Sequence, residues 1–160
     1  MVLKSNFFMF LSLVFLFGCS ATGEKYSSSQ VSLQNGNSEI VIYREGKLSA
    51  SGSDFCVKIG DESFGVLKNG GYLRTSLAPG KHTISLPFSN ELEIELEVKE
   101  GETEYVEFTI GLSSLYVIPI GTIASVSMSW DMSLVNTSAN YSLEKLVKLR
   151  ESEYSNNCNT

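Results

Sequence analysis

The sequence predicts an all-β protein, an antiparallel β-sandwich of immunoglobulin-like style with about seven or eight short strands. Short apolar runs alternate with polar residues at a period of two, which is the pattern of half-buried strands. Turn residues separate these runs at regular spacing, as in sandwich folds. Serine, glycine, β-branched and aromatic residues are plentiful, and helical heptads rich in alanine, lysine and glutamate are absent.

The expected strands follow one another after a polar N-terminal region. Three turns rich in glycine separate several of them, because glycine accepts positive φ and proline presets φ. These turns are Gly60-Asp61-Glu62, Asn69-Gly70-Gly71 and Ala78-Pro79-Gly80. Strands are expected over Glu39 to Arg44, Asp54 to Ile59, Ser63 to Leu67, Tyr72 to Leu77, Lys81 to Pro87, Glu91 to Val98, Thr103 to Ile110 and about Ser125 to Leu134.

The run from Glu91 to Val98 is the clearest amphipathic strand, since four glutamates alternate with four apolar residues. Together with the acids that follow it, this row could attract calcium or a basic partner. A solvated strand face, or a charged edge that blocks aggregation, is the favoured interpretation. The acids are Glu91, Glu93, Glu95, Glu97, Glu100, Glu102, Glu104 and Glu107.

The stretch from Gly111 to Trp130 carries no charged residue. A membrane span is rejected because Pro119 and Gly121 interrupt it and strict alternation with serine follows, which favours a long half-buried strand. Its apolar loop is the candidate partner contact, because an exposed patch of this type marks a partner or a membrane. Poor alternation within the loop favours core or mixed burial instead. The candidate residues are Leu115, Tyr116, Val117 and Ile118.

Helical spacing appears only near the C-terminus, where Leu143, Leu146, Val147 and Arg150 follow Ser142. A short closing helix is therefore expected. Residues 151–160 would form a polar tail after it.

The N-terminus has the order of a secretory signal, with Lys4 followed by the apolar run Phe7 to Phe17. The run is too short to span a bilayer, which takes about 20 apolar residues. Leu16-Phe17-Gly18-Cys19 resembles the lipobox of bacterial lipoproteins. The resemblance implies a signal peptide over residues 1–18, cleavage before Cys19 and acylation of Cys19 with chains such as palmitate. Ser20 in place of aspartate implies the outer membrane.

Residues 19–38 are rich in serine, asparagine, glutamine and glycine, a composition that cannot bury a core. We expect them to form a lipidated flexible tether, followed by one domain over residues 39–150. Loss of the signal removes Lys4 and no acid, which leaves 11 bases against 18 acids in the mature chain. That balance argues against a surface for nucleic acid or for anionic lipid, because both are held chiefly by clustered lysine and arginine.

Few residues suit catalysis or metal binding. Cys56 and Cys158 could pair in an oxidising compartment, or they could remain unpaired or form intermolecular links. His82 is the only histidine and follows a turn, so a structural role is favoured over a catalytic triad. A zinc site would need several histidines and cysteines at short spacing. We therefore expect no catalytic residue, no metal and no cofactor.

An ordered set of short motifs resembles a bacterial family of small envelope lipoproteins, domain of unknown function 2846, over roughly residues 39–147. The resemblance implies a β-sandwich and carries over no catalytic residues. The motifs are Ile42-Tyr43-Arg44, Val57 to Asp61, Gly65 to Tyr72, Leu77 to Thr83, Val98 to Val106, and Leu134 through Ala139 to Leu146.

Together these features predict a membrane-anchored envelope lipoprotein, a non-enzymatic binding or structural module that faces the periplasm. Its partners would be the membrane, through the lipid, and another envelope protein. The competing hypothesis is a small-ligand carrier or minor hydrolase of the envelope, which would need a roomy cavity or convergent polar groups.

Overall fold

The computed structural model describes residues 20–28, 36–87, 92–120, 123–156 and 158. The predicted signal peptide, Cys19 and Glu91 lie outside the described residues. The structure also leaves some side chains within the strands and turns undescribed, namely those of Ser49, residues 116–120, residues 123–126 and Met128.

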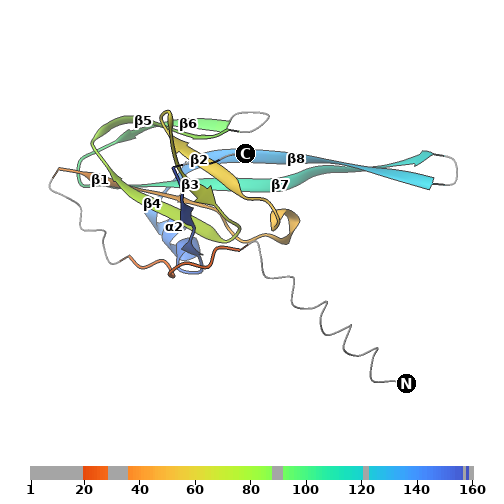
Figure 1. Cartoon of the computed structure of the whole chain (residues 1–160), viewed down its shortest axis with the longest axis horizontal. Coiled ribbons are helices and arrows are strands. Elements are labelled where there is room, and N and C mark those ends of the chain that lie inside the picture. The colour runs from red at the N-terminus through yellow and green to blue at the C-terminus, as the bar shows by residue number, and fades with distance from the viewer. Residues whose placement is uncertain (1–19, 29–35, 88–91, 121–122, 157, 159–160) are drawn as a thin grey trace, which may run out of the picture.

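Two five-stranded sheets face each other, which confirms the predicted all-β sandwich (Figure 1). The first sheet has the order β8-β7-β1-β4-β9 and the second the order β10-β3-β2-β5-β6. Ten strands are described instead of seven or eight, because two pairs of residues near the C-terminus add short strands. The strands are β1 (Ser38–Tyr43), β2 (Phe55–Ile59), β3 (Glu62–Leu67), β4 (Gly71–Leu77), β5 (Gly80–Leu86), β6 (Leu92–Val98), β7 (Thr103–Ile120), β8 (Ile123–Thr137), β9 (Arg150–Glu151) and β10 (Glu153–Tyr154).

Strand β1 occupies the centre of the first sheet. It pairs antiparallel with β4, placing Ile42 opposite Leu73, and parallel with β7, placing Ile42 opposite Val106. The parallel pair arises because the chain visits the second sheet through β5 and β6 before it returns as β7.

The main core lies between the two sheets. Phe55 of β2 and Phe108 of β7 meet edge to face across it, with ring centroids 4.7 Å apart. Such a contact adds about 1 kcal/mol to the burial of the two rings. Phe55 is partly buried, and the fully buried members of this core include Phe108, Ile40, Ile42, Val57, Leu67, Leu73, Ile84, Leu86 and Val106.

A second apolar cluster covers the outer face of the first sheet. Val41 and Tyr43 point to this side of β1, opposite to Ile40 and Ile42. The helix α2 (Ala139–Leu146) supplies Leu146, and the segment before the sandwich supplies Tyr26. Strand β1 is therefore buried on both faces.

The expectation of a flexible tether over residues 19–38 is wrong for residues 20–28. This segment runs along the end of the chain, where the Gly23 amide donates to the Glu151 carbonyl at 3.1 Å and the Tyr26 amide to the Leu149 carbonyl at 3.2 Å. Tyr26 is buried and meets Tyr72 edge to face at 5.2 Å. Burial of this aromatic ring offsets the entropy lost when the polar segment becomes ordered.

The expectation of a polar tail over residues 151–160 is also wrong. Strand β9 pairs with β4 in the first sheet, and β10 pairs with β3 in the second, so the last described segment joins both sheets. Cys158 then forms a disulfide with Cys56 of β2, with Cα atoms 5.6 Å apart. The helix also begins at Ala139, four positions earlier than Leu143, with Ser138 as its N-terminal cap residue.

Replacing both cysteines with alanine should lower the free energy of unfolding by about 4 kcal/mol. The two cysteines are 102 residues apart, so the bridge removes much conformational entropy from the unfolded chain. Urea unfolding followed by circular dichroism measures the change. A reducing agent should weaken the wild type similarly and leave the double variant unaffected. Two free thiols in the native protein, detected by non-reducing mass spectrometry, would contradict this pairing.

Candidate functional site

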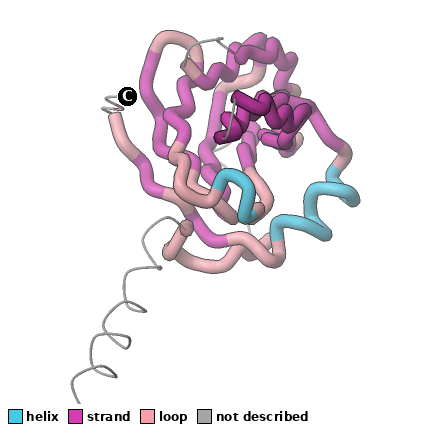
Figure 2. The backbone as a smooth tube through the Cα atoms, turned by 90° about the vertical axis from the view of Figure 1, so that its right-hand side faces the viewer, coloured by secondary structure: helices cyan, strands magenta, loops and turns pink. Residues whose placement is uncertain are grey.

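A two-stranded arm projects from one end of the sandwich, formed by the distal parts of β7 and β8 (Figure 1). The pairing of β7 with β1 ends at Glu107, whereas its pairing with β8 continues to Ile120. We define the arm as residues 111–130, which contain no charged residue. At about 3.3 Å per residue, the arm is about 30 Å long. In Figure 2, the view is turned so that the arm comes toward the viewer.

The base of the arm is anchored in the main core, and apolar side chains become exposed just beyond it. Phe108 and Ile110 are buried between the sheets. Leu112 pairs with Trp130 across the arm, and both side chains are exposed. Leu115 is 55% exposed and so does not belong to the core, which leaves mixed burial of the loop as the expectation. The change from buried to exposed apolar residues occurs where the second sheet no longer covers β7 and β8.

The other predicted contact residues lie in the same part of β7. Tyr116, Val117 and Ile118 belong to the arm by their backbone pairing with β8, and their side chains lie outside the described set. Hydroxyl groups bridge the two strands near the base, where Ser113 and Ser129 lie 2.9 Å apart. The arm thus combines exposed apolar side chains with serine hydroxyl groups that contact each other across its two strands.

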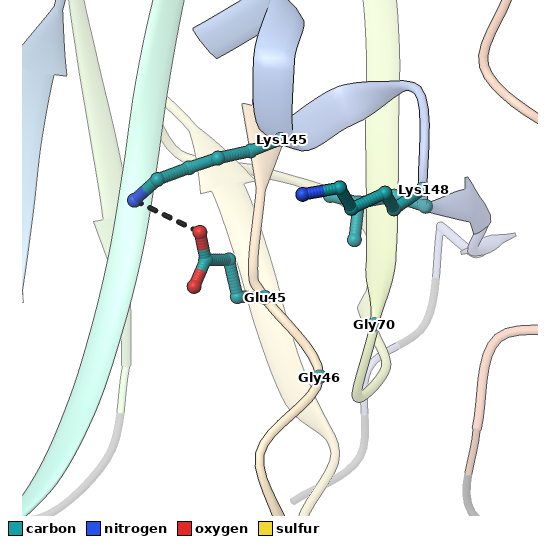
Figure 3. Close-up of a pocket in the computed structure, with 6 residues that line it drawn as sticks. Glu45, Gly46, Gly70, Lys145 and Lys148 are labelled. Carbon is teal, nitrogen blue, oxygen red and sulfur yellow. Dashed lines mark ion pairs between the residues drawn. The ribbon is translucent and has the colours of Figure 1, made fainter. Parts of the chain in front are cut away.

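A cluster of charged groups fixes α2 to the first sheet (Figure 3). The Lys145 ammonium lies 2.7 Å from Glu107 of β7 and 2.9 Å from Glu45, and it also donates to the Tyr141 hydroxyl. Burial alone would lower the pKa of Lys145, but these hydrogen bonds outweigh it and raise the pKa above its ordinary value. Lys145 is therefore charged at physiological pH.

A pocket of about 330 Å³ adjoins this cluster. Two close glycines, Gly46 and Gly70, form one wall, and Lys148 borders the pocket near Lys145 (Figure 3). Sequence reasoning missed this site. Glu45, Glu107 and Lys145 are far apart in the chain, so no local signal could have revealed that they meet.

The remaining predicted candidates have structural surroundings. His82 Nε2 lies 2.8 Å from the Ala78 carbonyl, within the turn between β4 and β5. Glu93, Glu95 and Glu97 are exposed on β6, which is an edge strand of the second sheet. Lys81 pairs with Glu95 at 2.9 Å. Acidic side chains on an edge strand hinder pairing with another chain.

Within the described ranges, no group of three or more histidine, cysteine, aspartate or glutamate residues could hold a metal ion. The described helices include none with the length and apolar character needed to cross a membrane. Comparisons with protein-family models, curated proteins and solved structures found no match. The resemblance to the small-lipoprotein family stays a prediction.

The variant Lys145→Met should lose about 3 kcal/mol of folding stability, because it leaves the buried Glu107 carboxylate without its cation. Thermal or urea unfolding measures the loss. Adding Glu107→Gln to the variant should restore part of it, whereas Lys81→Met, which removes an exposed ion pair, should cause no measurable change. Equal losses of stability from Lys145→Met and Lys81→Met would contradict a stabilising role for the ion pair between Lys145 and the buried Glu107.

The contribution of Lys145 to folding stability should depend on pH in a definite direction. A raised lysine pKa makes the stabilisation complete below the unfolded pKa, about 10.4, and the stabilisation is lost as the pH rises above that value. The stability difference between the wild type and Lys145→Met should therefore stay constant from about pH 6 to 9 and shrink above about pH 10.4.

Proposed function

We propose that the mature chain is an envelope lipoprotein of the outer membrane, acylated at Cys19 and facing the periplasm. It acts as a non-enzymatic binding module, and the arm contacts another envelope protein. The projection of the uncharged arm from the sandwich carries the proposed binding role, because none of the arm side chains that the structure describes belongs to the main core.

The physical chemistry of the arm favours a binding role. A two-stranded hairpin alone in water is only marginally stable, so a partner surface would stabilise it. The pairing of β7 with β1 ends at Glu107, so the described part of β7 beyond it extends past β1 and would offer an edge to an added strand. Leu112, Leu115 and Trp130 add exposed apolar surface along the same element.

The N-terminal chemistry supports the anchoring half of the proposal. Gly18 provides the small residue before the cut and Cys19 the thiol that accepts the lipid. Each methylene group of an acyl chain adds about 0.8 kcal/mol of membrane affinity when buried, so several chains on one residue would hold the domain stably.

Cells grown with a clickable fatty acid should incorporate the label into the wild-type protein and not into Cys19→Ser. The acyl chains need the thiol of Cys19, and serine does not replace it. The wild type should fractionate with membranes. Label on Cys19→Ser, or a purified native protein that begins at another residue, would contradict the proposed anchoring.

A photo-crosslinking amino acid at Leu115 should yield one discrete crosslinked species in intact cells, because this position lies on the exposed arm. Val135 provides the matched control, since it lies on β8 within the sandwich and is also exposed. The substitution Leu112→Glu should abolish the crosslink at Leu115 without changing thermal stability. Equal crosslinking from Leu115 and Val135, or none from Leu115, would contradict a binding role for the arm.

A further inference from the structure

We infer that the membrane docks against a defined face of the domain, formed by Ser20, Lys47, Leu48 and Lys148, which we term the anchor face. This inference rests on the proposed acylation of Cys19 and adds an orientation to it. The anchor face would contact the surface of the same bilayer that holds the lipid. The experiment that tests this orientation does not depend on how the lipid is attached to Cys19.

The start of the described chain is fixed to the domain. Ser20 forms a parallel bridge with Asn69, and the Ala21 amide donates to the Asn69 carbonyl at 3.1 Å. Adjacent Cα atoms are about 3.8 Å apart, so a lipid on Cys19 would enter the bilayer within a few ångströms of Ser20. A domain held this closely cannot rotate freely as it would on a long tether.

Leu48 directly follows Lys47 in the chain and is 96% exposed. It begins the 3-10 turn η2 (Leu48–Ala50). The Asn69 side chain accepts a hydrogen bond from the Lys47 amide at 3.0 Å, so Asn69 holds both the start of the chain and the approach to this turn. The lipid attachment and the exposed leucine are thereby fixed relative to each other.

The buried Arg44 holds the η2 turn in place through hydrogen bonds to backbone carbonyls. The Arg44 guanidinium donates to the Ser53 carbonyl at 2.7 Å and to the Ala50 carbonyl at 2.5 Å. It also lies over the Phe55 ring, 4.9 Å from its centroid. Burial lowers the pKa of Arg44, and nearby Asp54 opposes that shift. Leu48 thus lies on a turn whose backbone is held by the hydrogen bonds of Arg44.

The charges around Leu48 suit a lipid surface. Lys47 and Lys148 are both exposed, and Lys148 borders the same pocket as Gly46 and Gly70 (Figure 3). An apolar side chain flanked by lysines is the composition of protein segments that rest in the headgroup region. Lysine near an anionic bilayer also gains electrostatic attraction.

The exposed Glu100 and Glu102 lie toward the opposite end of β1, whereas Glu45 borders the same pocket as Lys148 and the exposed Asp54 follows the η2 turn. Ser38, at the start of β1, donates to the Lys99 carbonyl, and the exposed Glu100 and Glu102 occupy the same turn. Tyr43, at the other end of β1, directly precedes Arg44. The six residues of β1 separate these ends by about 17 Å. Glu100 and Glu102 therefore lie away from the anchor face, where Lys47 and Lys148 are exposed.

Tryptophan fluorescence with brominated lipids tests this orientation. The mature chain, made without its signal peptide, is coupled through the Cys19 thiol to a maleimide lipid in vesicles of phosphatidylethanolamine and phosphatidylglycerol. The other two cysteines are joined in a disulfide, so the coupling is specific. Trp130→Phe removes the natural tryptophan, and Leu48→Trp or Lys81→Trp introduces a reporter. Lys81 is the matched control, exposed on β5 near the opposite end.

Bromolipids should quench the Leu48→Trp fluorescence at least twofold and leave Lys81→Trp nearly unchanged. A flexible insertion of about ten glycine and serine residues between Cys19 and Ser20 should abolish the difference. Equal quenching at both positions, or none at Leu48→Trp, would overturn the inference. Because the lipid is coupled chemically, quenching at Leu48→Trp stands even if native protein lacks an acyl group, which would sink only the proposed function.

Discussion

The fold depends on β1, which is apolar on both faces. Ile40 and Ile42 pack between the sheets, and Val41 and Tyr43 point to the opposite side. A strand of this kind leaves apolar surface in water unless something covers the outer face. Helix α2, the segment 20–28 and the end of the chain provide that cover, so both terminal regions are drawn into the domain.

The arm differs from β1, because nothing in the described structure covers its exposed apolar side chains. Beyond Ile110, β7 and β8 leave the space between the sheets, and their apolar side chains lose the partners that bury Phe108. The pairing of the two strands continues to Ile120 without a core of its own, with one register shift between Leu112 and Ser114. A rigid base with an uncovered extension is an arrangement suited to contact with a second molecule.

The sequence predicts β1 to β6 well, because glycine turns and alternation mark them directly. It fails where packing between distant segments decides the structure. Tyr26 lies in a polar segment, and it becomes a core residue only by packing into the cluster that Tyr72 and Leu149 share with the outer face of β1. Pro119 indicated an interruption, yet it lies within β7, whose distal part pairs only with β8. Clustering of Glu45 and Glu107 with Lys145 depends wholly on the position of α2.

The attachment of residues 20–28 also determines how the domain would carry mechanical force. A pull entering at Ser20 would load the hydrogen bond from Ala21 to Asn69 first, then that from Gly23 to Glu151, then that from Tyr26 to Leu149. The second and third bonds end on the segment that runs to Cys158, and the disulfide passes the load on to β2. Tension at the start of the chain would thus be shared between the two sheets through a covalent link.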